Sequence, residues 1–333
     1  MFEAFYGLSG APFQLSPDPS FFYGSRGHRR AYSYLQYGLY QGEGFITLTG
    51  EVGAGKTTLI RNLVQQLDSS KVVAAQLVST QLDADSLLRA VAAAFGLAIR
   101  EHDKARVIAT LEAYLLSLVS KNKRALLIVD EAQNLEPQAV EELRMLSNFQ
   151  VRNRALLQSF LVGQPELRQL MRSPRMQQLR QRVIASYHLG PLDRDETRAY
   201  IEHRLKQVGW KGDPSFQEEV FPLVHSYTGG IPRRINTLCG RALLAGFLSE
   251  KHLISVVEVE RVIAELAEEF GDVPAAQNRL APVPTVVPDE PNLVGLEKRI
   301  MGVEKTMAIT VNLLRNMIRT RKPSDPDWSE NTH

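Results

Sequence analysis

The 333-residue sequence predicts an α/β fold, in which a parallel sheet of five strands is followed by a small helical domain. Five short apolar segments show little alternation of polar and apolar residues, which is typical of strands buried on both faces of a parallel sheet. Segments with helical periodicity separate them, and this order indicates βαβ units. From residue 193 onward the pattern is helical only, which indicates a second, all-helical part.

The expected elements follow one another regularly along the chain. The strands are Phe45–Thr49, Val72–Val78, Ala125–Asp130, Leu156–Val162 and Val183–His188. The helices of the α/β part are Thr57–Leu67, Ala84–Phe95, Lys104–Ser120, Pro137–Phe149 and Pro165–Leu179. Those of the helical part are Asp193–Gln207, Phe216–Tyr227, Ile231–Leu248 and Val256–Phe270. Right-handed crossovers place the loops after the strands along one edge of the sheet, where ligands of such sheets bind.

An N-terminal segment, residues 1–40, precedes the sheet and is rich in aromatic residues, glycine and proline. We expect it to be ordered and packed on the α/β core, because so many aromatic side chains rarely remain in water. It should end in a helix from about Arg29 to Tyr40. The α/β domain then spans residues 41–190, and the helical domain spans residues 191–270.

The C-terminal 63 residues have a different character. Residues 271–292 hold five prolines and no periodic apolar face, so they are expected to be a linker. In residues 293–321 apolar side chains recur at alternating three- and four-residue steps, which predicts an amphipathic helix suited to coiled-coil pairing with a second copy or a partner. The alternative is a helix docked on its own body. Residues 322–333 are expected to be disordered.

Composition excludes several classes of protein. The 39 basic and 37 acidic residues nearly cancel, so the net charge of +2 says little about partners. A single cysteine, Cys239, excludes an internal disulfide and a cysteine-based zinc site, and its apolar helical context predicts a core position. No apolar run approaches the roughly 18 residues of a membrane helix, and no secretory signal is visible. We therefore expect a cytoplasmic protein.

The first chemical motif lies between the first strand and the helix that follows it. It fits the pattern G-x-x-x-x-G-K-[ST], whose glycines let successive N–H groups point at phosphate oxygens. Lys56 can bridge the outer two phosphates, and the hydroxyl of Thr57 can bind magnesium. The expected phosphate loop comprises Gly50, Glu51, Val52, Gly53, Ala54, Gly55, Lys56, Thr57 and Thr58.

The second motif is the acidic pair Asp130 and Glu131 at the end of a buried strand. Asp130 can hold magnesium, and Glu131 can orient and polarise an attacking water. We expect this pair and the lysine-bearing loop to meet across adjacent strand ends. The following Gln133 and Asn134 could be polar sensing groups or a helix cap, and the cap is favoured for Asn134.

Three further positions could act on a nucleotide. Gln164 follows the fourth strand and is expected to sense the terminal phosphate or the water, although it could be a turn residue before the helix that Pro165 starts. Gly229 to Asn236 opens a helix of the helical part, from which Arg233, or alternatively Arg234, could reach across to the nucleotide.

Arginines are concentrated in one stretch of the chain. Between Leu143 and Ala185 there are eight arginines and one acidic residue. Arg180 or Arg182 could reach the nucleotide of a neighbouring subunit, because a delocalised cation stabilises charge on a transferring phosphoryl group. The alternatives are a solvated basic surface and contact with nucleic acid.

Together these motifs resemble the AAA+ ATPase superfamily and, more narrowly, the ExeA (GspA)/TniB-like ATPases. The resemblance covers about residues 1–270. It is carried by Phe5–Leu8, Pro12-Phe13, Pro17-Asp18-Pro19, Phe22, GEVGAGKTT at Gly50–Thr58, VDEAQNL at Val129–Leu135, LRMLSNF at Leu143–Phe149, VGQPEL at Val162–Leu167 and GGIPRRIN at Gly229–Asn236. It implies ATP and Mg²⁺ as cofactors and a nucleotide-dependent homo-oligomer. It also implies an arginine finger at Arg180 or Arg182, a second sensor at Arg233, and an N-terminal segment near the adenine.

Within this family, the chain resembles the ATPases encoded beside exosortase (PEP-CTERM) and exopolysaccharide loci. Two features carry this narrower resemblance: the stretch GSRGHRRA at Gly24–Ala31 and the lack of a membrane helix. ExeA-type proteins carry a membrane helix and a peptidoglycan-binding region after the ATPase, where this sequence has only a linker and a candidate coiled coil. The resemblance implies a Mg-dependent ATPase in envelope export or polysaccharide assembly, held at the inner membrane through partners if at all. The alternatives are an ATP-dependent DNA-binding assembly protein of the TniB type and a nucleotide-binding scaffold with negligible turnover.

Overall fold

The structure is a computed structural model that describes residues 2–16, 18–78, 82–98, 103–152 and 154–270, all of which belong to one compact unit. The expected linker 271–292, helix 293–321 and tail 322–333 lie outside the described residues. Among the residues that the structure describes, no helix combines the length and the apolar character that crossing a membrane requires.

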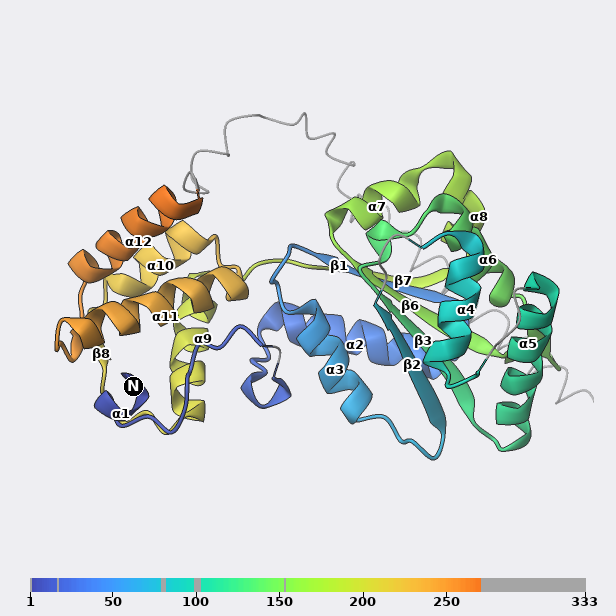
Figure 1. The fold of residues 1–333 in the computed structure, drawn as a ribbon, viewed down its shortest axis with the longest axis horizontal. Helices are drawn as coiled ribbons and strands as arrows, with labels where there is room; N and C mark the ends of the chain where they lie inside the picture. The colour runs from blue at the N-terminus through green and yellow to red at the C-terminus, as the bar shows by residue number, and fades with distance from the viewer. Residues whose placement is uncertain (1, 17, 79–81, 99–102, 153, 271–333) are drawn as a thin grey trace, which may run out of the picture. The chain divides into compact units, whose positions relative to one another are not determined.

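A five-stranded sheet forms the centre of the α/β part (Figure 1). Its strands are β1 (Phe45–Gly50), β2 (Val72–Val78), β3 (Arg124–Asp130), β6 (Leu157–Gly163) and β7 (Val183–Leu189). They run parallel in the order β2-β3-β6-β1-β7. The predicted parallel α/β sheet is confirmed. The strand order places β6 between β1 and β3, so the ends of the two motif-bearing strands are near each other but not adjacent.

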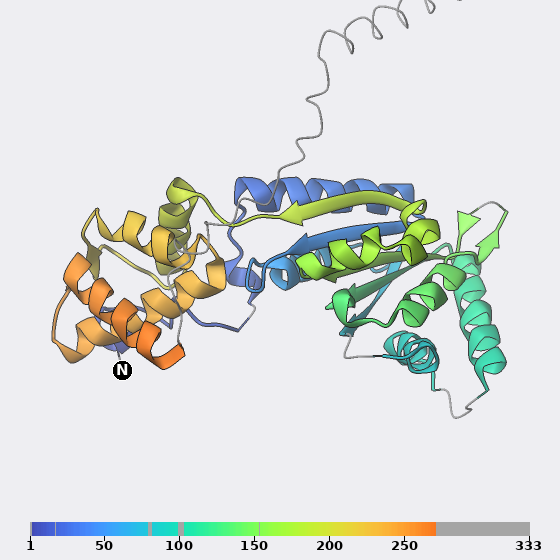
Figure 2. The same ribbon diagram turned by 90° about the horizontal axis from the view of Figure 1, so that it is seen from above.

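Helices cover both faces of the sheet, as the apolar strands require (Figure 2). Helices α2 (Arg26–Gln41) and α3 (Lys56–Gln65) pack on one face, over Ile46, Leu48 and Phe160. The other face is covered by α4 (Ala84–Ala94), α5 (Lys104–Ser120), α6 (Pro137–Leu146) and α7 (Pro165–Arg172). Strands β1, β3 and β6 are buried along almost their whole length, which explains their lack of polar alternation.

The structure differs from the expected elements at one proline and at two small strand pairings. The helix expected over Pro165–Leu179 breaks after Arg172, because Pro174 has no N–H to continue it and Ser173 before it is extended. A 3₁₀ turn (Pro174–Met176) and the short helix α8 (Gln177–Arg180) follow. The short pairs β4 (Gln150–Val151) with β5 (Arg154–Ala155) and β8 (Ser215–Phe216) with β9 (Leu253–Ile254) were not predicted. The second pair delays the start of α10 (Val220–Thr228).

The helical part consists of α9 (Arg194–Gln207), α10, α11 (Pro232–Leu248) and α12 (Val256–Phe270) around a core of its own. Tyr6, Leu8 and Phe13 from the N-terminal segment are buried in this core, and the Tyr6 hydroxyl lies 3.1 Å from the carbonyl oxygens of both Leu243 and Lys251. The expected segment 1–40 therefore divides: its first part packs with the helical part, and α2 packs on the sheet. Cys239 is a core residue, as predicted, and burial raises the pKa of its thiol to about 12.

Candidate nucleotide-binding site

The loop between β1 and α3 has the backbone that the glycine pattern predicts. Gly53 and Gly55 have φ values of +81° and +99°, which favour glycine. A Cβ atom at Gly55 would lie 2.7 Å from Nε2 of His28, and one at Gly53 would lie 2.3 Å from Cβ of Arg233. Gly55 precedes the first residue of α3, and no side chain caps this helix. The first amides of α3 are therefore placed as donors for an anion.

Lys56 is buried at the start of α3, with 6% of its surface exposed. Its Nζ donates hydrogen bonds to the carbonyl oxygens of Gly50 (2.6 Å) and Glu51 (3.0 Å), which both belong to the loop. Burial lowers the pKa of Lys56, and the nearby carboxylates of Glu131 and Asp130 oppose that shift. A buried ammonium beside uncapped helix amides fits the phosphates of a nucleotide.

The acidic pair at the end of β3 contacts this loop across the strand that separates them. The hydroxyl of Thr57 donates to Oδ2 of Asp130 (3.0 Å), and the backbone N–H of Glu131 donates to Oδ1 (3.0 Å). Burial raises the pKa of Asp130, although these hydrogen bonds oppose the shift. A hydroxyl and a carboxylate next to a phosphate loop are oxygen ligands of the kind that suit Mg²⁺, which takes one or two protein ligands together with phosphates.

Glu131 is held by two amide side chains. Its backbone is in the left-handed region (φ 53°), which is uncommon for a residue other than glycine. Gln133 and Gln164 each donate from Nε2 to Oε2 of Glu131, at 2.6 and 3.1 Å. Burial alone would raise the pKa of Glu131, but these two hydrogen bonds lower it overall. The carboxylate is therefore ionised and fixed in position near Lys56.

Gln133 and Asn134 have different positions. Oε1 of Gln133 accepts from the backbone N–H of Gln164 (2.9 Å), so Gln133 joins the ends of β3 and β6. Asn134 lies in a 3₁₀ turn, Ala132–Asn134, and the residue before α6 is Glu136. The interpretation of Asn134 as a helix cap is therefore wrong, because α6 begins three residues later, at Pro137.

Of the predicted arginines, Arg233 reaches the pocket beside the phosphate loop. Its backbone N–H donates to the carbonyl oxygen of Gly53 (3.2 Å), and it lines the pocket, whereas Arg234 is not among the lining residues.

The other two predicted arginines lie elsewhere. Arg180 donates to the carbonyl oxygens of Met171 and Ser173, at the end of α7. Arg182 donates to the hydroxyl of Ser147 after α6 (2.8 Å). Neither lines this pocket, and their action on a second copy stays a prediction.

The pocket continues from the phosphate loop to a second end, lined in part by the N-terminal segment that the resemblance places near the adenine. Aromatic residues of the N-terminal segment line it together with Tyr200 and Arg204 of α9 and Asn236 of α11. Arg204 is buried and donates to the carbonyl oxygens of Pro12 (2.6 Å) and Gln14 (2.9 Å), while its guanidinium lies 4.4 Å from the centre of the Phe21 ring. No local spacing marks Arg204, because its partners are about 190 residues away in the sequence.

His28, in the GSRGHRRA stretch, is buried, and its burial predicts a dependence of stability on pH. Burial lowers the pKa of His28 to about 4, so between pH 6.5 and about 4 the unfolded chain binds a proton that the folded chain does not. We expect the free energy of unfolding to fall by about 2 to 3 kcal/mol more in wild type than in His28→Gln between pH 7.5 and 4.5. Denaturant titrations at both pH values measure this. If the free energy of unfolding fell equally in the two proteins, the conclusion that His28 is neutral when buried would be contradicted.

The fold is a P-loop NTPase fold of the AAA+ type, with a glycine-rich loop of the phosphate-binding pattern at one edge of its parallel sheet. In agreement, residues 39–171 match the family model of the AAA domain. The chain is also similar to General secretion pathway protein A of Aeromonas hydrophila, with 41% identity over 255 residues. That alignment covers 76% of this chain and 46% of the relative, so this chain spans about half the length of the relative.

Solved structures share the fold at low sequence identity. Cdc6p from Pyrobaculum aerophilum matches with a TM-score of 0.57 and 14% identity, over 82% of this chain and 85% of that chain. ORC2 of Aeropyrum pernix, in ADPNP–ADP complexes, matches with a TM-score of 0.55 and 20% identity, over 72% and 67%. Drosophila ORC bound to DNA gives 0.56 and 17%, over 73% and 61%. These likenesses show the fold alone.

Proposed function

We propose that the protein binds ATP with Mg²⁺ and hydrolyses it. The observation that carries this proposal is that Lys56, Thr57 and Glu131 line one end of one pocket, where the Thr57 hydroxyl also donates to Asp130. Lys56 and the first amides of α3 would contact the outer phosphates, and the far, aromatic end of the pocket would take the base. The similarity to General secretion pathway protein A supports an ATPase of the same family.

Each residue has a distinct role in the proposed hydrolysis. Thr57 and Asp130 would hold magnesium, which neutralises charge on phosphate oxygens. The Glu131 carboxylate would accept a hydrogen bond from the attacking water and orient it. Gln164 lies next to Glu131 and would reach the water or the terminal phosphate, and Arg233 would approach from α11. The positions of the side chains around the loop support these proposed roles.

A turnover assay tests this function and its metal dependence. We expect phosphate release from ATP in the presence of Mg²⁺, and loss of at least about 100-fold in rate when a chelator removes the metal, because charge stabilisation is a major part of phosphoryl transfer. ADP binding measured beside turnover separates an ATPase from a nucleotide-binding scaffold. Tight binding with no turnover in either condition would favour the scaffold.

We further propose that the protein acts as a nucleotide-dependent homo-oligomer. Arg180 and Arg182 lie away from their own nucleotide pocket, where they could contact the pocket of a neighbouring copy. The amphipathic pattern of residues 293–321 offers a second route to self-association or to a protein partner. The molar mass of the full chain and of a variant ending at residue 292, each with and without ATP, distinguishes the two routes.

For the cellular process we propose envelope export, because the similar protein from Aeromonas hydrophila is a general secretion pathway protein. A link to exosortase or exopolysaccharide assembly is the narrower form of this proposal, and association with the inner membrane would occur through partners. Affinity capture with Glu131→Gln in the presence of ATP tests it. The alternative, DNA-dependent assembly, predicts duplex binding that weakens with salt.

A further inference from the structure

The first turn of helix α2 contacts the phosphate loop through His28. His28 is buried, and its backbone N–H donates to the Ser25 hydroxyl oxygen (3.2 Å), which caps α2. The same oxygen lies 2.7 Å from Nδ1 of His28. Burial lowers the pKa of His28, and a hydrogen bond between its ring and the backbone of Ala54 opposes this shift. Nε2 also lies directly against Gly55.

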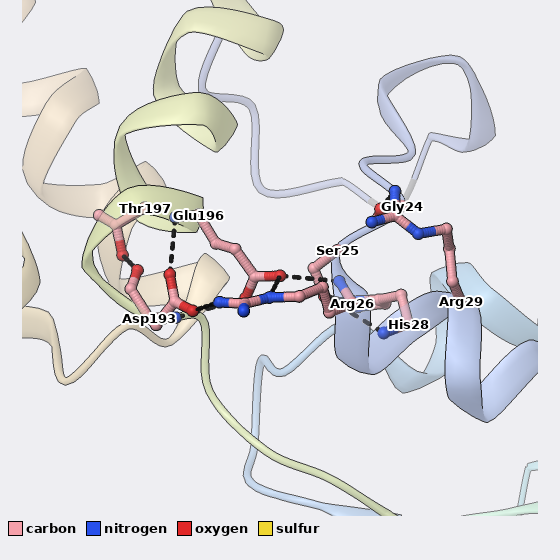
Figure 3. A network of polar contacts seen from close by, with 8 residues as sticks. All are labelled: Gly24, Ser25, Arg26, His28, Arg29, Asp193, Glu196 and Thr197. Atoms are coloured by element: carbon pink, nitrogen blue, oxygen red, sulfur yellow. Dashed lines mark hydrogen bonds and ion pairs between the residues drawn. The ribbon is translucent and has the colours of Figure 1, made fainter.

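The same turn contacts the start of α9 through Arg26, the first residue of α2 after the cap (Figure 3). The backbone N–H of Arg26 donates to Oε1 of Glu196 (2.7 Å), and its Nε lies 3.3 Å from the same oxygen. Its Nη2 contacts Oδ2 of Asp193. Asp193 and Glu196 form the capping box of α9, so one arginine holds both acidic residues that fix the start of that helix.

Beyond its first turn, helix α2 is fixed on the sheet. Ala31 and Leu35 are buried against it, and a Cβ atom at Gly38 would lie 1.7 Å from a side-chain carbon of Ile46. Only residues 190–193 connect the end of β7 to the start of α9. A rotation of α9 about this short connection would therefore change the contacts of Arg26 in the first turn, while the part of α2 from Ala31 onward stays on the sheet.

We infer that the first turn of α2 couples nucleotide at the phosphate loop to the orientation of the helical part, with His28 and Arg26 as positioning residues. The inference rests on the proposed nucleotide binding. Nucleotide that shifts Ala54 and Gly55 displaces His28, and Arg26 on the same turn transmits the displacement to Asp193 and Glu196. Coupling of this kind is reciprocal, so the contact at α9 also changes nucleotide affinity.

The exposure of the Arg26 contact makes the coupling measurable. The side chains of Arg26 and Asp193 are 71% and 44% exposed. Exposed ion pairs contribute little to stability, so removing the guanidinium should leave the protein folded. A change in nucleotide affinity in such a variant then reports the coupling and not a loss of fold. Arg30, which is exposed on the same helix, provides a matched control.

The test is a double-mutant cycle in Mg-ADP affinity, measured by calorimetry on the full chain. We expect about two- to five-fold weaker binding in Arg26→Met, about ten-fold in His28→Leu, and no further loss in the double variant. Arg30→Met should bind as wild type does. His28→Gln keeps a donor near Ala54, so it should retain near wild-type affinity. Adding Arg26→Met to it should weaken binding as it does in wild type. The inference can therefore still be tested if His28→Leu folds poorly.

Hydrogen exchange supplies a second readout. On addition of ADP the amides of residues 190–200 should become protected in wild type and Arg30→Met, and this response should be lost in Arg26→Met. Independent effects in the cycle, or an unchanged response in Arg26→Met, would overturn the inference. Wild type that binds no nucleotide overturns the proposed function as well, whereas nucleotide binding with unaltered affinity in Arg26→Met overturns the coupling alone.

Discussion

Replacing Lys56 by alanine is expected to weaken ATP and ADP binding by at least about 100-fold, because hydrogen bonds to charged groups contribute about 1.5–3 kcal/mol each and this side chain would make more than one. Within the described residues its ammonium donates to two loop carbonyls, Gly50 and Glu51. These acceptors carry no net charge, so they place the ammonium at the anion site without neutralising it. Binding of a fluorescent nucleotide or calorimetry measures the loss.

The matched control for this substitution is Lys71→Ala. Lys71 is exposed before β2, where it pairs with Asp68, so its removal takes away one positive charge at a distance from the pocket. We expect the control to bind as wild type does. Circular dichroism and thermal unfolding show whether Lys56→Ala is folded. A folded Lys56→Ala protein with wild-type affinity would remove the phosphate loop from the proposed function.

The part of the site that follows strand ends was predictable from the sequence. Two short motifs at the ends of buried strands contain Lys56, Thr57 and Asp130. Their residue types and spacing can be read from the sequence without knowledge of distant contacts. The parallel sheet brings those motifs to one edge, so the Thr57–Asp130 contact follows once the fold is known. Gln164 next to Glu131 follows in the same way, because β3 and β6 are paired.

The other part depends on contacts between distant segments, which leave no local pattern. Arg204 holds carbonyl oxygens of Pro12 and Gln14, and Arg26 binds residues 193 and 196. Each of these side chains has an ordinary place in a helical sequence, so periodicity cannot distinguish it from a solvated arginine. The break at Pro174 is different, because the effect of proline on a helix could have been applied to the sequence directly.

Glu131→Gln is expected to bind nucleotide with nearly wild-type affinity and to lose about 10²- to 10⁴-fold in turnover, the range that a positioned acid or base contributes. The hydrogen bonds from Gln133 and Gln164 lower the pKa of Glu131, so the wild-type side chain is an anion at neutral pH and can accept from water. Glutamine keeps the size of the side chain but not its charge. Steady-state phosphate release and ADP affinity, measured on the same preparation, separate the two effects.

Glu136→Gln makes the same chemical change five residues away, at the residue before α6, where the side chain caps nothing. Its turnover should match wild type, which excludes a general effect of losing one negative charge near the end of β3. Glu131→Gln should also hold unhydrolysed ATP, so that nucleotide recovered from the protein after mixing is mostly ATP. Turnover within about three-fold of wild type would assign the water to another residue, and Gln164, which donates to the same carboxylate, would then be the first to substitute.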